Sequence, residues 1–533
     1  MISPRIPRGL ACGVVLALGA ALTPTARAQD PFQPGMRWRV PSPANLPAVP
    51  RSAAFSSAGG VVWTASNGPN PGFDLLSGHG LGTMSGLFHD AAPTGATGAM
   101  AVAAGEGHEG LFALVQVPSP DATHRATLVS RYSAVAAAQG APFTPVWSFD
   151  SGLRSNGAAR LACDEIGARL FVATYDGPTP QVRVDALDAA SGTSTAHAFV
   201  AANSLQELAI AADGTRAAMA CGTSLWIVDE TCSVRHQQPI AQATSALSVS
   251  GDGARVAFGG SKVTLLVEVV GGYALDAEIL GNPGELATRV ALSRDGSTVA
   301  IGWWNATAAG GVRFETWSVA THARLFEIAQ PGVPAGLQNA PEVVRVTADG
   351  SRAALGSWGD GTSAPEVWLW DRATNAIVLS VDLPGSVFAL DLDASGTRFV
   401  VGMKGAHANV FSGTGEFRSY ETGERDLALS SPARVGLPLD LSARRTGASA
   451  VFFLSGTRSP APVFIPGVTG SLQLNRVGLS VRRLTADANG RADTSWGIPN
   501  DPLLIGTWRH LQAVFRVNGV LGMGTTVIDV PVY

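Results

Sequence analysis

The sequence has little charge and no region in which positive charge is concentrated. Charged residues make up 15% of the 533 residues, and 37 Lys and Arg are scattered among 41 Asp and Glu. A protein that holds a nucleic-acid backbone needs clustered Lys and Arg, so we exclude nucleic acid as a partner. The low charge, with 62 Gly and 33 Pro, argues against long charged helices and favours many short strands joined by tight turns.

Long hydrophobic runs are missing after the first 28 residues, so we predict no transmembrane segment. Within those 28 residues, two arginines precede an apolar run over 10–22, and Ala26–Ala28 is a small-x-small cleavage signal. The pattern predicts a secretory signal peptide over 1–28, followed by an N-terminal linker over 29–42. We therefore expect an exported protein, periplasmic or extracellular, and we expect it to be a monomer.

Cysteine is scarce, and three cysteines remain after the predicted cleavage: Cys163, Cys221 and Cys232. Three is an odd number, so at least one thiol stays free, and the spacing does not decide which two would pair. No metal-type cysteine spacing is present. Cys163 occupies a position that is apolar elsewhere in the repeat described next, which predicts a buried structural thiol.

A strand, turn and strand recur along the chain, as in "VALSRDGSTVAIGWW" from Val290 to Trp304. The copies align on a turn glycine, with spacings of 47, 39, 43, 54 and 46 residues between Gly167, Gly214, Gly253, Gly296, Gly350 and Gly396. The residues six and four positions before each glycine are apolar, as is typical of a strand with one buried face. The glycine can take the positive φ that a tight hairpin turn requires. A period of roughly 40 to 50 residues suits a propeller blade of four strands.

A third strand follows several copies, clearest at "SLWIVD" (224–229) and "EVWLWD" (366–371). This order of strand, Asp-Gly turn, strand and Trp-Asp strand resembles the WD40 and YVTN-type β-propeller repeats. The resemblance covers 152–424, and "AAFSSAGGVVWTA" and "AMAVAAGEGHEGLFALV" add two more copies over 53–65 and 99–115. We predict a β-propeller over 43–424. Eight copies favour eight blades, and the commonness of seven-bladed rings keeps seven open.

The repeat stops near Gly423, and 425–533 contains short alternating strands with Gly and Asn turns, which predicts a small β-sandwich domain. Its "DANGRADTSWGIPNDPLLIG" resembles an accessory C-terminal domain that recurs in exported bacterial proteins. The fold class predicted for the whole chain is all-β: a seven- or eight-bladed β-propeller followed by a small β-sandwich. Within the motif, Asp487, Asn489 and Asp493 are a weak candidate for a metal site, and a hairpin turn explains them as well.

No linear motif for catalysis is present: the sequence has no G-x-S-x-G and no H-E-x-x-H, and its nine histidines are dispersed. We therefore predict a non-catalytic exported scaffold without a cofactor, which binds a protein or glycan partner. The alternative is a propeller enzyme, such as a hydrolase or a quinoprotein dehydrogenase. It rests on "GARLFVATYDG" and "VDALDAASG" (167–177 and 184–192), which resemble one repeat of the pyrroloquinoline-quinone propeller type.

A binding face is predicted where the second strand of each repeat leads into the third. Large aromatic and basic residues gather at these positions: Tyr175, Lys262, Trp303, Trp304, Trp358 and Lys404. Exposed aromatic rings offer a large rigid contact area to protein partners and to sugars. The alternative is that each tryptophan packs into the seam between neighbouring blades.

Overall fold

In the computed structural model, the backbone is described for sixteen ranges of the chain. These are 35–41, 49–55, 61–67, 74–80, 86–91, 99–104, 111–118, 125–132, 144–154, 158–305, 311–332, 339–407, 414–422, 426–429, 435–504 and 507–531. The predicted signal peptide lies outside these residues. Their regular structure is β throughout, apart from one short 3-10 turn, η1 (Pro502–Leu504). No helix among the described residues is long and apolar enough to cross a bilayer.

Eight four-stranded antiparallel sheets are present in the described part of residues 35–421. In chain order they are β2 (Val49–Phe55), β3 (Val61–Asn67), β4 (Asp74–Gly80) and β5 (Gly86–Ala91); β6 (Ala99–Ala104), β7 (Leu111–Pro118), β8 (Arg125–Tyr132) and β9 (Trp147–Arg154); β10 (Ala159–Cys163), β11 (Arg169–Asp176), β12 (Gln181–Asp188) and β13 (Ser194–Ala201); β14 (Glu207–Ile210), β15 (Arg216–Cys221), β16 (Ser224–Asp229) and β17 (Val234–Pro239); β18 (Leu247–Val249), β19 (Arg255–Phe258), β20 (Lys262–Val269) and β21 (Gly272–Leu280); β22 (Glu285–Leu292), β23 (Thr298–Asn305), β24 (Val312–Ser318) and β25 (Ala323–Gln330); β26 (Pro341–Val346), β27 (Arg352–Ser357), β28 (Val367–Asp371) and β29 (Ala376–Val381); and β30 (Val387–Leu392), β31 (Arg398–Lys404) and β32 (Gly415–Glu421), completed by β1 (Gly35–Pro41).

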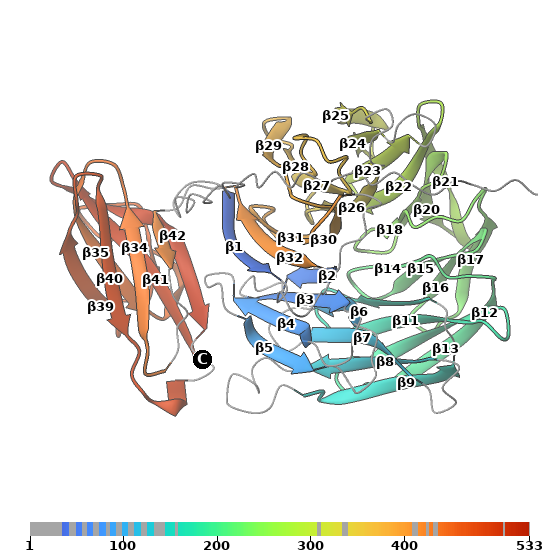
Figure 1. The fold of residues 1–533 in the computed structure, drawn as a ribbon, viewed down its shortest axis with the longest axis horizontal. Helices are drawn as coiled ribbons and strands as arrows, with labels where there is room; N and C mark the ends of the chain where they lie inside the picture. The colour runs from blue at the N-terminus through green and yellow to red at the C-terminus, as the bar shows by residue number, and fades with distance from the viewer. Residues whose placement is uncertain are drawn as a thin grey trace, which may run out of the picture.

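The first strands of successive sheets contact one another in turn from β2 to β30, and β30 contacts β2, so the sheets close into a ring (Figure 1). This is the predicted propeller architecture. Both degenerate copies form hairpins, β2–β3 and β6–β7.

Strand β1 lies in the segment that we expected to be a linker. Residues Gly35–Pro41 pair antiparallel with β32 and form the outermost strand of the last sheet. The linker expectation is therefore wrong for these seven residues. The physical reason is that β32 would otherwise be an unpaired edge, and the N-terminal strand supplies the missing backbone partner.

The turn glycines adopt the conformation that the repeat predicts. All six have positive φ, from 63° at Gly396 to 71° at Gly253. Each turn is closed by a backbone hydrogen bond from the glycine to the carbonyl three residues earlier, as from Gly396 N–H to Asp393 O at 2.9 Å. Tight turns of this kind bring the two apolar strands of each hairpin into register.

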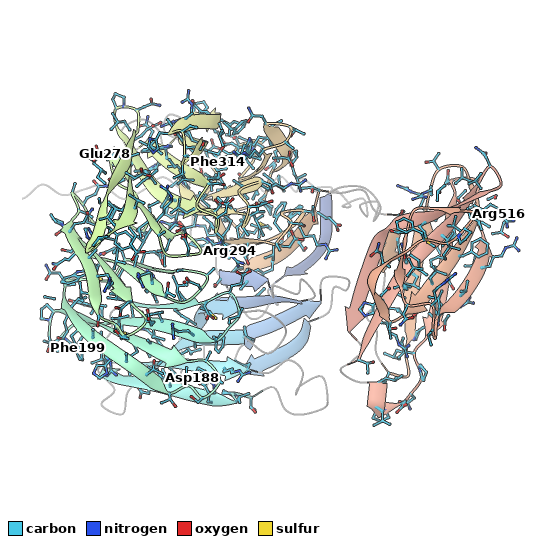
Figure 2. The ribbon with its side chains drawn as sticks, turned by 180° about the vertical axis from the view of Figure 1, so that it is seen from behind. Asp188, Phe199, Glu278, Arg294, Phe314 and Arg516 are labelled. Atoms are coloured by element: carbon cyan, nitrogen blue, oxygen red, sulfur yellow. The ribbon has the colours of Figure 1, made fainter. Side chains whose placement is uncertain are left out.

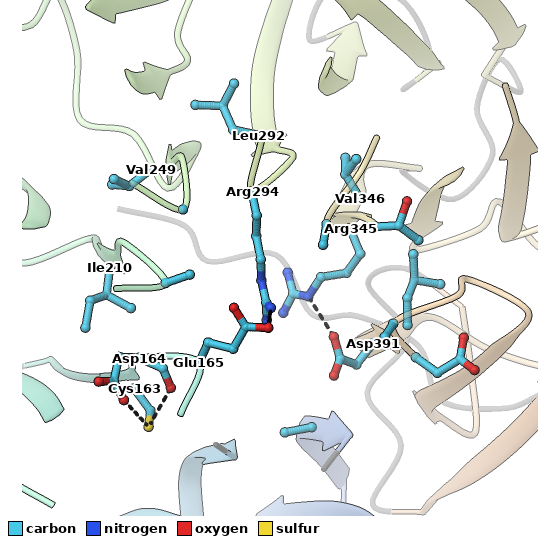
Figure 3. Close-up of a pocket in the computed structure, with 18 residues that line it drawn as sticks. Cys163, Asp164, Glu165, Ile210, Val249, Leu292, Arg294, Arg345, Val346 and Asp391 are labelled. Carbon is cyan, nitrogen blue, oxygen red and sulfur yellow. Dashed lines mark hydrogen bonds and ion pairs between the residues drawn. The ribbon is translucent and has the colours of Figure 1, made fainter. Parts of the chain in front are cut away.

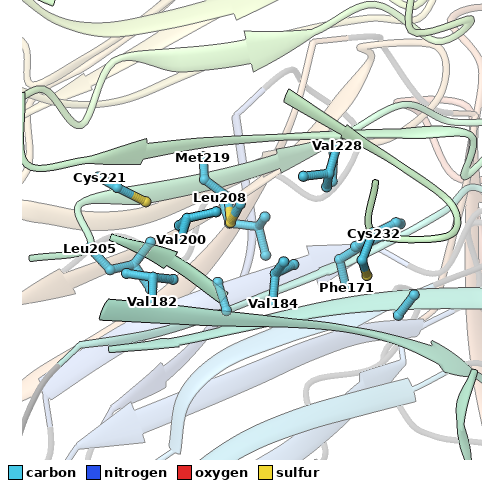
Figure 4. Packing of buried hydrophobic residues seen from close by; sticks show 13 residues of the cluster. Phe171, Val182, Val184, Val200, Leu205, Leu208, Met219, Cys221, Val228 and Cys232 are labelled. Carbon is cyan, nitrogen blue, oxygen red and sulfur yellow. The ribbon is translucent and has the colours of Figure 1, made fainter. Parts of the chain in front are cut away.

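The core of the ring lies in the seams between neighbouring sheets. In one seam, Phe171 and Val184 pack against Leu208 and Met219 of the next sheet, and Cys232 completes the cluster (Figure 4). Similar clusters fill the following seams. Stacking the sheets face to face buries the alternating apolar residues that the sequence pattern marks.

Three further sheets follow the ring. They are β33 (Leu427–Leu429), β34 (Pro438–Arg444) and β40 (Arg491–Gly497); β37 (Val468–Thr469), β42 (Val520–Pro531), β41 (Trp508–Val517), β35 (Ala448–Gly456) and β39 (Ser480–Thr485); and β36 (Arg458–Val463) with β38 (Leu472–Leu474). The first two share one apolar core, in which Leu441 of β34 packs with Phe453 of β35 and Phe515 of β41. Two sheets over a common core are typical of a β-sandwich.

Candidate functional site

The predicted binding residues lie where second strands end and third strands begin. Each of the six residues is in such a position on the sheets that contain β11, β20, β23, β27 and β31. We call this end of the ring the Trp face. Tyr175, Lys262, Trp304 and Trp358 are partly exposed, whereas Trp303 and Lys404 are buried.

Trp303 belongs to the core and not to the surface. Its side chain is fully buried, and a Cβ at Gly281 would lie 2.6 Å from the ring. The indole N–H donates to Glu315 at 2.8 Å, and the Arg313 guanidinium lies 5.1 Å from the ring centroid. Arg313 is itself held by Glu285, with Nη2 to Oε2 at 2.5 Å. Trp303 therefore packs in the seam between two sheets, as the alternative prediction states. The buried charged side chains of Glu315, Arg313 and Glu285 hold its indole there.

Trp358 lies at the centre of a group that spans three sheets. Its indole N–H donates to Glu342 Oε2 at 3.0 Å, and Glu342 Oε1 lies 3.1 Å from Arg289 Nη2. The Phe388 ring is 6.5 Å from the Trp358 ring between centroids, with a 30° tilt, and Lys404 Nζ lies 5.7 Å from the Phe388 centroid. We call these five residues the Trp358 cluster. Sequence reasoning found Trp358 and Lys404 but missed the others, because they lie in first strands, where the repeat pattern indicates only core.

The remaining predicted residues stand apart from this cluster. Trp304 is partly exposed, and its indole nitrogen has no hydrogen-bond partner among the described residues. Lys262 pairs with Glu278 on the neighbouring strand, Nζ to Oε1 at 2.5 Å, and Tyr175 packs on the edge of the Phe171 seam. Tyr175, Lys262 and Trp304 are thus separate, partly exposed positions on the Trp face, outside the Trp358 cluster.

A second feature lies on the ring axis, at the end where first strands turn into second strands. A pocket of about 490 Å³ opens there, and its wall has two layers set by the turn glycines. The residues four before each glycine form the first layer: Cys163, Ile210, Val249, Leu292, Val346 and Leu392. The residues two before it form the second: Glu165, Ala212, Gly251, Arg294, Ala348 and Ala394. The first layer is therefore largely apolar. The second layer has small side chains, except at the two charged residues Glu165 and Arg294.

Those two charged residues meet. Arg294 and Glu165 form an ion pair, although their sheets are separated by two others in the ring, so the pair crosses the lumen (Figure 3). Arg294 lies near the middle of the ring, while Phe199 and Glu278 lie on its outer side (Figure 2). Beside it, Arg345 pairs with Asp391, Nε to Oδ1 at 3.4 Å. The pocket lining thus contains two ion pairs, Glu165–Arg294 and Arg345–Asp391.

No family model matches the chain, and no curated protein matches it in sequence. Among solved structures, hydrazine synthase from Kuenenia stuttgartiensis is similar with 15% identity and a TM-score of 0.35, over 46% of this chain and 73% of that chain. Similarity at this level carries no argument about chemistry. The fold described above rests on the sheets themselves.

Cys163 lines the pocket and is partly exposed, so the prediction of a buried residue is wrong here, but its thiol is not set up as a nucleophile. Desolvation of the thiol, reinforced by the neighbouring Asp164 carboxylate, raises the pKa of Cys163 well above its ordinary value. The Sγ lies 3.2 Å from the Asp164 carbonyl oxygen. Cys163, Cys221 and Cys232 are all free thiols, and burial raises the pKa of Cys221 to about 12. Thiols that stay protonated at neutral pH are unreactive, as expected of structural cysteines.

The candidate metal ligands Asp487, Asn489 and Asp493 form hydrogen bonds within a hairpin turn and with the neighbouring strand. Asp487 Oδ1 accepts the backbone N–H groups of Asn489 and Arg491, both at 2.8 Å. Asp493 accepts from Arg491 at 2.9 Å and from the Ser442 hydroxyl at 2.5 Å. Across the described ranges, no three His, Cys, Asp or Glu side chains are grouped so that they could hold a metal ion.

Proposed function

We propose that this protein is an exported, non-catalytic β-propeller scaffold that binds a protein or glycan partner through the Trp358 cluster. The observation that carries the proposal is the pair of rings at its centre. Trp358 and Phe388 are both partly exposed and lie 6.5 Å apart between centroids. They come from two neighbouring sheets, so the ring of sheets fixes their relative position.

The cluster combines the two properties that such a partner needs. Aromatic rings give contact area at low entropic cost, because they have only two rotatable side-chain bonds. Glu342 and Arg289 lie beside them, and both are partly exposed, so carboxylate and guanidinium groups are within reach of a sugar hydroxyl or a peptide group. Arginine and tryptophan are also the residues that most often dominate binding energy at interfaces.

The test is a binding screen of the secreted protein on glycan arrays and in pull-downs from extracellular fractions. We expect Trp358→Ala to weaken the captured interaction at least tenfold, and Trp358→Phe to retain most of it. Trp317→Ala is the matched control, because Trp317 is also partly exposed but lies far from the Trp face. Strand β24 begins at that face with Val312, and Trp317 is near its other end, where the indole N–H donates to Glu315 at 3.1 Å. Equal loss with Trp358→Ala and Trp317→Ala would contradict the proposal.

The enzymatic alternative makes a different prediction for the same preparation. A quinoprotein dehydrogenase would carry a tightly bound quinone and stoichiometric calcium. Absorption spectroscopy and metal analysis of protein purified from its native source would detect both. Either finding would replace the scaffold proposal.

A further inference from the structure

The axial pocket is a second candidate site, on the other end of the ring from the Trp358 cluster. Its volume of about 490 Å³ is in the range of small-molecule sites. Four of the six residues in the second layer, two before each turn glycine, are alanine or glycine, which leaves space beside Glu165 and Arg294. The layer beneath offers the side chains of Ile210, Val249, Leu292, Val346 and Leu392. The pocket therefore has an apolar floor and a charged mouth.

The order of charges at the mouth favours an anion. In the view of Figure 3, the guanidinium groups of Arg294 and Arg345 both reach toward the middle of the pocket, with Glu165 on one side of them and Asp391 on the other. Two like charges next to each other are unfavourable unless an opposite charge lies between them. A guanidinium has five N–H donors in a planar fork that matches a carboxylate. Each of these two is paired with one carboxylate.

The two other acidic residues of the lining do not compete for this position, because their carboxylates are used in turns. Asp164 Oδ1 accepts the Ala168 N–H at 2.8 Å. Asp393 Oδ1 accepts the Arg398 N–H at 3.1 Å, and its carboxylate also accepts the Ser395 hydroxyl. The charges that can rearrange are therefore the four at the mouth.

The Glu165–Arg294 pair can exchange its partner. The side chains are 37% and 46% exposed, and ion pairs this exposed contribute little because water solvates both charges. Glu165 can turn into solvent while a ligand carboxylate takes its place between Arg294 and Arg345. The ligand's apolar part would then lie on the Val249 and Leu292 side chains beneath.

We propose that the axial pocket binds a small organic carboxylate with an apolar body, held by Arg294 and Arg345 in exchange for Glu165. This site is independent of the Trp358 cluster, which lies at the other end of the ring. The scaffold proposal can fail without affecting it.

The test is isothermal titration of the purified protein with octanoate, and with octylamine as the probe of opposite charge. We expect octanoate to bind and octylamine not to bind. Arg345→Gln and Arg294→Gln should each weaken octanoate at least tenfold, whereas Glu165→Gln should strengthen it because the competing carboxylate is gone. The opposite signs separate a binding role from a structural one, since loss of either partner of a structural pair would act in the same direction.

The outcomes that overturn the proposal are equally specific. Absence of octanoate binding, tighter binding of octylamine, or weaker octanoate binding in Glu165→Gln would each do so. Circular dichroism and thermal melting accompany every variant, and we expect unchanged melting temperatures because these side chains are exposed. If Arg294→Gln nevertheless unfolds, Arg345→Gln and Glu165→Gln still decide the question.

Discussion

Arg352 donates a hydrogen bond from Nη1 to the carbonyl oxygen of Gly396 at 3.1 Å, across the seam between two neighbouring sheets. The donor stands two residues after one turn glycine, and the acceptor is the turn glycine of the next copy. Arg169 makes the same contact to Gly214 at 2.9 Å. Each such arginine links consecutive hairpins around the ring, so the repeat encodes the contact between sheets as well as the hairpin itself.

Replacing Arg352 should therefore destabilise the ring. Its guanidinium also pairs with Asp371, Nε to Oδ2 at 2.9 Å, and donates to the Thr422 hydroxyl at 3.0 Å. Removing it leaves three acceptors without this donor, and we expect Arg352→Ala to lower the free energy of unfolding by about 1 to 3 kcal/mol. Urea unfolding followed by tryptophan fluorescence measures the change. Arg235→Ala is the control, because Arg235 is exposed on β17, and an equal effect of both variants would contradict the assignment.

The turn glycine Gly396 is constrained both by its positive φ and by its close neighbours. Gly396 has a φ of 63°, and a Cβ there would lie 2.7 Å from Thr347 Cγ2 and 2.9 Å from Arg352 Cβ. Gly271 has a φ of 91°, but a Cβ there would meet nothing within 4 Å. Both alanine variants carry the backbone penalty of about 1 to 2 kcal/mol, and only Gly396→Ala adds the clash. We expect a clearly lower melting temperature for Gly396→Ala, and equal losses would show that the neighbouring sheet does not constrain this turn.

Much of the ring could be predicted from sequence because it depends on local rules. The turn glycines and the alternating strands follow from a period of two within strands and from the φ that a tight turn needs, whereas the sequence left seven and eight blades open. Strand β1 could not be found in this way. A single strand that pairs with β32, more than 370 residues later, has no repeat context, and its pairing depends on ring closure.

The axial pocket was missed for a different reason, although a signal exists. The residue two before each turn glycine is small in four copies and is Glu165 or Arg294 in the other two. Two opposite charges at one repeat position indicate a pair across the axis once the ring is known. The sequence left exposure and seam packing open for Trp303, because the choice depends on whether the neighbouring chain segment leaves space beside the indole ring, and Gly281 provides that space.

Glu366 should make the stability of the ring depend on pH. Its side chain is fully buried, and burial, with the nearby charges of Asp382 and Asp360, raises the pKa of Glu366 to about 8. His407 Nδ1 lies 3.6 Å from Oε1, while Oε2 accepts the Leu383 N–H at 2.6 Å. Between the ordinary carboxyl pKa and about 8, the folded chain keeps a proton that the unfolded chain has lost. The contribution of Glu366 is thus fully present at acidic pH and is lost as the pH rises through about 8.

Glu366→Gln removes this dependence. We expect the variant to gain stability relative to the natural chain between pH 5 and pH 9, by roughly 4 kcal/mol at most. Chemical unfolding at a series of pH values measures the difference. Glu278→Gln changes an exposed carboxylate and should follow the natural chain at every pH. A constant difference between Glu366→Gln and the natural chain would show that the carboxyl is ionised throughout.

The last prediction concerns where the chain can be divided. Strand β32 ends at Glu421 and β33 begins at Leu427, and the ring and the C-terminal sheets have separate apolar cores. We therefore expect residues 29–424 and 426–533 each to fold alone, with the cooperative melting of an independent domain.

A fragment starting at residue 43 should behave differently from one starting at 29. Without Gly35–Pro41, the last sheet loses its outer strand, and the backbone groups of β32 that pair with β1 are left at an open edge. We expect the 43–424 fragment to melt several degrees below 29–424 and to aggregate more readily, as measured by circular dichroism and light scattering. Adding a synthetic peptide of residues 33–42 should restore part of the loss, because the same edge accepts a strand supplied in trans. Equal melting temperatures for the two fragments would mean that β1 contributes nothing to closure, and unfolding of 29–424 would place the C-terminal sheets within the same cooperative unit as the ring.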